Sequence, residues 1–351
     1  MRAPSYTSLD DALETLAPYG TELRNGNSNH APMVAEALCA MGHPDAVMPW
    51  VARYRERLLP RSAAGDRISD EDWRSALGQR GRFTEWAALF GEELQDAPWP
   101  EVLDHWVGRL APGFSAAATH GVIRVGHAVR SLAVTETPYR LRELADALAS
   151  WADRYQELPT SRDIAKGTMT PREAITKVAV VPRDNRRPAG NITASLAALD
   201  DFPEFAPAIG LIDVGGDIAS LLSELTDVFT RIYLANAHNI LTTIVFIHGV
   251  TSLAALGGIV AHVSDATARS ALAYAWQSGC GLYACFGGST AMAQKIEPPE
   301  DDDDGLVDRA IANGDEHVIK FTEACLRRHA LSPSPAYVAA IDSALGVMPR
   351  R

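Results

Sequence analysis

The sequence predicts an all-α fold, in which residues 1–351 form one domain, a multi-helix bundle with an active-site cavity at its helical core. Three observations predict this fold class. Apolar residues recur at spacings of three and four along most of the chain, as on one face of a helix. Capping residues precede these segments. No long stretch alternates apolar and polar residues in the manner of a half-buried strand.

The first two helices are predicted from their ends. Ser8 can cap a helix over 8–18, because a serine side chain accepts a hydrogen bond from a free N–H of the first turn. Ser28 can cap a helix over 28–42 in the same way, and Gly42 can end it.

Two later helices carry clear internal signals. In 216–240 the residues Leu221, Leu225, Val228 and Ile232 form an apolar stripe at helical spacing. Asp315 is a plausible N-cap for a helix over 315–329.

The full set of predicted helices is 8–18, 28–42, 68–78, 83–94, 99–110, 114–132, 138–156, 169–180, 216–240, 241–263, 265–285, 306–313, 315–329 and 335–346.

One of these segments is apolar enough to require a membrane test. Residues 244–263 approach the length of a spanning helix. They contain two histidines and three glycines, and no cluster of Lys and Arg flanks them. We therefore expect a buried helix of a soluble bundle and no membrane partner.

Composition restricts the class of function. The net charge of −12 argues against nucleic acid as a partner, because phosphate binding needs clustered Lys and Arg. The four cysteines are scattered without a zinc spacing, and the N-terminus lacks the apolar core of a signal peptide. We expect a cytoplasmic protein with buried, reduced cysteines.

Histidines are the residues in which chemistry is most expected. Seven of the ten lie on apolar faces or at the starts of apolar helices. A single histidine in such a place is usually a hydrogen-bonded core residue. Several on separate helices are how helical bundles build metal sites, although spacing alone does not identify the metal.

Other enzyme motifs are absent from the sequence. It contains no GxGxxG after a strand, no P-loop and no GxSxG elbow. A nicotinamide cofactor such as NADPH would have to bind without these fingerprints.

Four short segments occur in an order that resembles the questin oxidase-like family: SNHAP at 28–32, THGVIR at 119–124, IHGVT at 247–251 and DEHVIK at 315–320. This family includes Baeyer–Villiger-type oxidases that open anthraquinone rings in aromatic polyketide pathways, a part of secondary metabolism. The resemblance implies an oxidoreductase, an oxygenase that takes O2 and an aromatic small molecule. His127 stands where fungal members tend to have a tyrosine, so we do not infer the substrate of this protein from the substrates of the fungal members.

The resemblance also implies the site residues. They are His30, His120, His248 and His317, which would hold one iron ion at about 2.0–2.3 Å, with Lys320 as a further ligand and catalytic group. Reserve positions for a ligand are His127, His238 and His262.

Two of the expected roles have alternatives. Lys320 would have to lose its proton or become carbamylated to approach a cation, or it pairs with a glutamate on the helix surface. Arg124 either holds a phenolate or carboxylate as a catalytic residue, or forms a buried structural pair. For the whole protein, the alternatives are an NADPH-dependent oxidase without a metal and a non-catalytic helical binding protein.

Overall fold

The computed structural model describes all residues except 1, 70, 162–166, 188–190 and 289, and it confirms the all-α class. Helices contain 67% of the residues and strands 3%. The helices of the first half are α1 (Leu9–Leu16), α2 (Ala31–Ala40), α3 (Pro44–Tyr54), α4 (Trp73–Ala76), α5 (Phe83–Asp96), α6 (Trp99–Leu110), α7 (His120–Val134) and α8 (Pro138–Asp153). Those of the second half are α9 (Pro171–Ala174), α10 (Ile192–Leu196), α11 (Ile218–Asn236), α12 (Ile240–Ile259), α13 (Asp265–Phe286), α14 (Asp303–Asn313), α15 (Glu316–Leu331) and α16 (Pro335–Val347).

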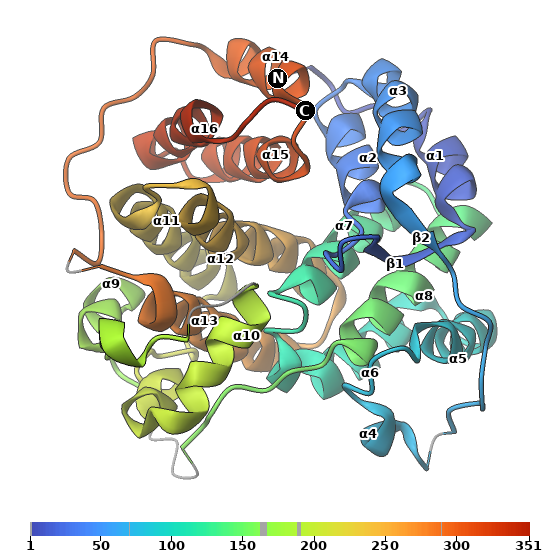
Figure 1. Cartoon of the computed structure of the whole chain (residues 1–351), viewed down its shortest axis with the longest axis horizontal. Helices are drawn as coiled ribbons and strands as arrows, with labels where there is room; N and C mark the ends of the chain where they lie inside the picture. Colours follow the sequence, from blue (N-terminus) through green and yellow to red (C-terminus); the bar gives the residue numbers. More distant parts are fainter. Residues whose placement is uncertain (1, 70, 162–166, 188–190, 289) are drawn as a thin grey trace.

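Helix α12 lies at the centre of the bundle. It packs against α7, α11, α13 and α15, which surround it (Figure 1). Its residues are apolar on every face, and a helix of that kind is stable in water only when it is covered on all sides. Within the described residues, Ile240–His262 is long and apolar enough to cross a membrane, but 72% of its most apolar window is buried inside the protein.

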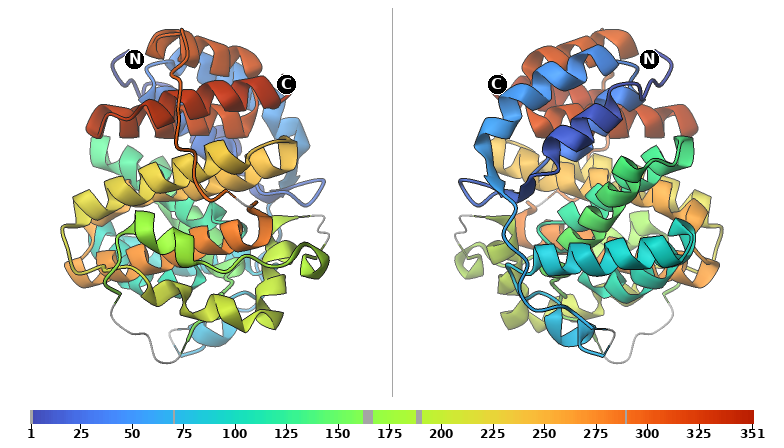
Figure 2. Two further views of the ribbon diagram at one scale, coloured as in Figure 1. Left: turned by 90° about the vertical axis from the view of Figure 1, so that its left-hand side faces the viewer. Right: turned by 90° about the vertical axis from the view of Figure 1, so that its right-hand side faces the viewer.

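The two ends of the sequence pack together at one end of the molecule. Helices α1–α3 lie beside α14–α16 there, as both side views in Figure 2 show. Contacts between α2 and α15 join these groups, and α2 also packs on α7. Residues from positions near 30, 120 and 317 are therefore brought to one region.

Several predicted boundaries were wrong. The predicted helix 114–132 begins only at His120, because three residues before it have left-handed backbone. The predicted helix 68–78, of which residue 70 lies outside the described residues, contains the single turn Trp73–Ala76. The predicted helix 169–180 is one α-turn followed by a 3-10 turn, Ile175–Lys177.

Two helices and two short strands are not evident from the sequence. Helix α3 was not predicted, because it contains Pro49 in its interior, and α10 is only a short turn. Two short strands, β1 (Tyr19–Leu23) and β2 (Leu58–Pro60), pair antiparallel and were not predicted because neither shows a clear alternation.

Candidate metal centre

The four histidines named from the sequence converge at one buried point. The Nε2 atom of His120 lies 2.8 Å from Nε2 of His30 and 3.3 Å from Nε2 of His248. The ring centre of His317 lies 4.7 Å from that of His30 and 5.6 Å from that of His248. One nitrogen each of His30, His120 and His317 lies within 4.8 Å of the other two, which is a spacing that one ion can span.

Different elements bring these side chains together. His30 is the N-cap residue of α2, His120 is the first residue of α7, and His317 follows the first residue of α15. His248 lies in the middle of α12 and faces the three helix starts. Four segments that are far apart in the sequence thus build one cluster around the central helix.

Hydrogen bonds orient three of the four rings. The Nδ1 atoms of His120 and His248 donate to the backbone carbonyls of Ala117 and Ile244, the latter at 2.6 Å. Nδ1 of His317 lies 3.2 Å from the carboxylate of Asp315. A carbonyl or carboxylate oxygen only accepts, so each Nδ1 carries the proton and each Nε2 presents a lone pair. This is the arrangement that second partners give to metal-bound histidines.

Burial favours the neutral form of His30, His120 and His248. It lowers the pKa of His30 and of His120 well below the usual value, and the nearby positive charge of Lys320 lowers both further. Burial and then the His120 charge lower the pKa of His248 in the same way. The neutral imidazole is the form that binds a metal.

These residues fit a metal ion. Several lone pairs facing one another in a buried space repel, and a shared cation removes that repulsion. The Nδ1 atom of His30 is also buried and has no hydrogen-bond partner among the described residues, so this ring is less constrained than the others. Imidazole donors suit iron, copper, zinc and nickel alike.

Lys320 is buried beside the cluster, with 2% of its surface exposed. Its Nζ atom lies 3.9 Å from the sulfur of Met33, and among the described residues it forms no ion pair. Glu316 and Glu323 pair with arginines instead, so the surface pair considered as an alternative for Lys320 is wrong. Burial lowers the pKa of Lys320 to about 7, although the charges of Glu316 and Asp315 oppose the shift.

The turn before His120 has unusual backbone geometry. Ala117, Ala118 and Thr119 have φ values of 49°, 58° and 70°. Left-handed backbone is unfavourable for residues with a Cβ, by roughly 1–2 kcal/mol each. The turn places the Ala117 carbonyl on Nδ1 of His120, and Thr119 Oγ1 donates to the His248 carbonyl at 3.5 Å. Strained backbone is thus located directly beside two of the converging histidines.

The three reserve histidines lie outside the cluster. His127 donates from Nδ1 to Glu36 at 2.6 Å, within a buried network that includes Arg130. The ring of His262 lies 4.9 Å from that of Trp99 and is tilted by 58° against it. His238 is exposed. None of these three side chains is therefore part of the cluster of four histidines.

Arg124 is held by a carboxylate. Its Nε and Nη2 atoms donate to the two oxygens of Glu143 at 2.6 and 2.8 Å, and both side chains are buried. Asp146 lies 3.8 Å away on the same helix as Glu143. This geometry is the buried structural pair that the sequence left open, and it commits the donors that a substrate anion would need.

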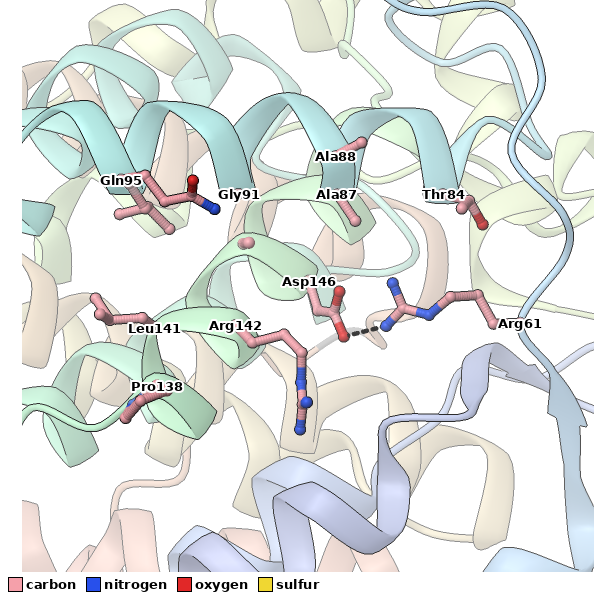
Figure 3. Close-up of a pocket in the computed structure, with 12 residues that line it drawn as sticks. Arg61, Thr84, Ala87, Ala88, Gly91, Gln95, Pro138, Leu141, Arg142 and Asp146 are labelled. Atoms are coloured by element: carbon pink, nitrogen blue, oxygen red, sulfur yellow. Dashed lines mark hydrogen bonds and ion pairs between the residues drawn. The ribbon is translucent and has the colours of Figure 1, made fainter.

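One surface pocket lies away from the histidines. It has a volume of about 470 Å3 and is formed between α5 and α8, where Arg61 bonds Asp146 across its mouth (Figure 3). Its walls are mainly short apolar side chains such as Ala87 and Leu141. No residue next to a histidine of the cluster lines it.

A smaller pocket, of about 390 Å3, is lined by residues of α3, by Glu316 of α15 and by Arg351. Tyr54 lines it and accepts a hydrogen bond at 3.1 Å from the backbone N–H of His30. Glu316, the residue before His317, lines the opposite wall. Tyr54 could not be identified from the sequence, because it lies on α3, a helix that the sequence does not predict.

Comparison with known proteins identifies one family. The family model described as questin oxidase-like matches residues 27–325. The matched segment contains all four histidines and Lys320. No curated protein matches the chain.

Proposed function

Because this chain belongs to the questin oxidase-like family, we propose that it is an iron-dependent oxygenase that oxidises or cleaves an aromatic polyketide of the anthraquinone type with O2. The family description indicates an oxidase; iron, O2 and the substrate are the proposal. The observation that carries it is the convergence of His30, His120 and His248 through Nε2 atoms at 2.8 and 3.3 Å, with His317 beside them.

The chain's own residues supply binding, orientation and exclusion of water. His120, His248 and His317 each direct a lone pair into the same space, because each ring donates its Nδ1 proton to an oxygen atom, of Ala117, Ile244 or Asp315 respectively. All four histidine residues are at most 9% exposed, so water reaches the space poorly. Bound iron would supply the redox chemistry by which O2 reacts with an aromatic ring.

Lys320 is proposed to complete this set as a carbamate. The neutral amine attacks CO2, a nitrogen–carbon bond forms as one carbon–oxygen π bond opens, and a proton leaves the nitrogen for solvent. The product is an anion that offers an oxygen donor, which the histidines lack. The burial of Lys320 without an ion pair among the described residues supports this role, because an isolated buried ammonium is unfavourable.

Metal analysis and O2 uptake test the proposal together. Protein purified without added metal should contain stoichiometric iron, measured by plasma mass spectrometry. It should consume O2 in the presence of hydroxyanthraquinones such as emodin. A chelator should abolish this uptake and ferrous iron should restore it.

Two results would contradict the proposal. Folded protein that takes up no redox metal would leave the four histidines as core residues. Oxidation of NADPH with substrate by metal-free protein would instead support an NADPH-dependent Baeyer–Villiger-type oxidase.

A further inference from the structure

The smaller pocket has the properties of a small-molecule site. It is lined by side chains of α3 and by the segment that leads into α15, and its volume of about 390 Å3 lies within the range of ligand sites. Two of its lining residues connect it to the histidines, because Tyr54 accepts a hydrogen bond from the backbone N–H of His30 and Glu316 directly precedes His317. The pocket of Figure 3 has no such relation to the histidines, because its lining residues come from α5, α8 and Arg61 and none of them is next to a histidine of the cluster in the sequence.

Charged side chains of both signs lie at this pocket. Three guanidinium groups line it, from Arg53, Arg57 and Arg351. Two carboxylates oppose them: Glu316 lies 2.9 Å from Arg351 and 3.4 Å from Arg57, and Asp315 lies 2.9 Å from Arg351. Carboxylates thus engage Arg57 and Arg351, and Arg53 is the lining arginine that takes no part in these pairs.

Arg53 can meet the charge of an anion. It is exposed at the pocket, and within the described part of the chain it has neither a hydrogen bond nor an ion pair. Arginine is suited to phenolates and carboxylates because its planar group donates two parallel hydrogen bonds. The donors of Arg53 are therefore free for a ligand.

The wall of the pocket is built from stacked planar groups. The rings of Trp50 and Tyr54 lie 4.5 Å apart and nearly parallel, at 19°. The guanidinium of Arg57 lies 4.8 Å from the centre of the Tyr54 ring. The indole N–H of Trp50 donates to the Gly314 carbonyl at 2.9 Å, which fixes the stack. Flat aromatic ligands pack well against guanidinium and ring faces.

We propose that this pocket binds the substrate of the oxygenase, and that it selects a planar aromatic anion, a phenolate or carboxylate, whose charge is met by Arg53. The inference rests on the proposed function for the identity of that anion as substrate. It adds the place of binding, the recognised charge state and the residue that recognises it. The segments carrying His30 and His317 then form the inner wall of the substrate pocket.

Binding without turnover tests this inference separately from the oxygenase. The full chain, as purified and under anaerobic conditions, is titrated by calorimetry with anthraquinone-2-carboxylate and with its uncharged amide. The carboxylate should bind more tightly than the amide. Arg53→Gln should weaken binding of the carboxylate about fivefold and Arg53→Glu about twentyfold, in keeping with a partly exposed ion pair, and both should leave amide binding unchanged.

Arg55→Gln is the matched control, since Arg55 is exposed two residues away and does not line the pocket. It should bind the carboxylate like the unchanged protein. Equal binding of carboxylate and amide would overturn the inference, and so would equal effects of Arg53→Gln and Arg55→Gln. A protein that lacks iron yet shows the Arg53 dependence would refute the oxygenase while retaining the anion pocket.

Discussion

The Nε2 atoms of His30 and His120 face each other at 2.8 Å, while Nδ1 of His120 is bonded to the Ala117 carbonyl. Without an ion, the two rings can form a hydrogen bond only if Nε2 of His30 donates to Nε2 of His120. The Nε2 atoms of His248 and His120 then face each other at 3.3 Å with a lone pair on each and no proton between them. One cation satisfies all three nitrogens. This geometry supports the proposed metal site.

Loss of His120 should remove the metal and preserve the fold. His120→Ala removes a nitrogen that lies close to those of two other histidines. Metal affinity should fall by more than about 100-fold, because about 100-fold is the largest loss expected when only a hydrogen-bond partner of a metal ligand is removed. Plasma mass spectrometry after dialysis measures the metal, and far-UV circular dichroism checks the fold. His238→Ala, at an exposed histidine, is the control and should keep its metal. Full metal occupancy in His120→Ala would exclude this site.

Lys320 should be needed for chemistry beyond its charge. Lys320→Met keeps the length and removes the nitrogen, and Lys320→Arg keeps the charge but forms no equivalent carbamate. Both variants should lose metal or O2 uptake, and Lys320→Arg should also be destabilised by several kcal/mol because its buried charge has no described partner. The carbamate itself should appear as a carbon-13 resonance after exposure to labelled bicarbonate. A fully active, fully metallated Lys320→Met protein would leave Lys320 without a role.

Arg124 should act through stability and not through catalysis. Arg124→Met leaves the Glu143 carboxylate buried without its partner, so the free energy of unfolding should fall by about 3–5 kcal/mol. The double variant Arg124→Met with Glu143→Leu should recover much of that loss. Activity per folded molecule should remain near that of the unchanged protein in both. A loss of activity in the well-folded double variant would instead place Arg124 on the substrate.

Stability should depend on pH through Asp153. Burial raises the pKa of this carboxyl to about 6, against hydrogen bonds such as that from the backbone N–H of Arg82. The folded state then holds the proton more tightly than the unfolded state, so the stabilisation is complete below about pH 4 and is lost as the pH rises through 6. Between these values the unchanged protein should lose up to about 2–3 kcal/mol relative to Asp153→Asn. Urea unfolding of both proteins from pH 4 to 7.5 measures this difference; parallel curves would contradict it.

The left-handed turn should respond unusually to glycine. Ala118→Gly relieves backbone strain of about 1–2 kcal/mol, which offsets the lost methyl group and the added freedom of the unfolded chain. Its stability should therefore change little. Ala128→Gly, in the regular part of α7, has no strain to relieve and should lose about 1.5–2 kcal/mol. Urea unfolding compares the two, and equal losses would show that the turn is unstrained.

Much of the helical framework could be predicted from the sequence, because caps and apolar spacing are local signals. Asp315 was expected as an N-cap, and its carboxylate does accept the backbone N–H of His317 at 2.8 Å. The same carboxylate also lies against Nδ1 of the His317 ring, which no spacing rule specifies. The turn at Ala117 was missed because it contains no glycine, the usual sign of positive φ.

The site could not be predicted from local sequence patterns. Nothing in the spacing of His30 and His317 shows that α2 and α15 touch, so their convergence was implied only by the resemblance. The partners that decide the roles of neighbouring residues are also distant in sequence. Tyr54 holds the backbone of His30, and Met33 contacts Lys320. Such contacts follow from the packing of whole helices.

The positions of the histidines make a bound ion a cross-link between the two ends of the chain. Residues 30 and 317 enclose most of the sequence, and an ion held by both closes that loop in the folded state alone. Its binding energy adds to the free energy of unfolding by mass action, in proportion to the logarithm of the free metal concentration. The melting temperature of the protein should thus report the metal supply of its surroundings. Shortage of the ion would first loosen the contact of α2 with α15, the junction where the beginning and the end of the polypeptide meet.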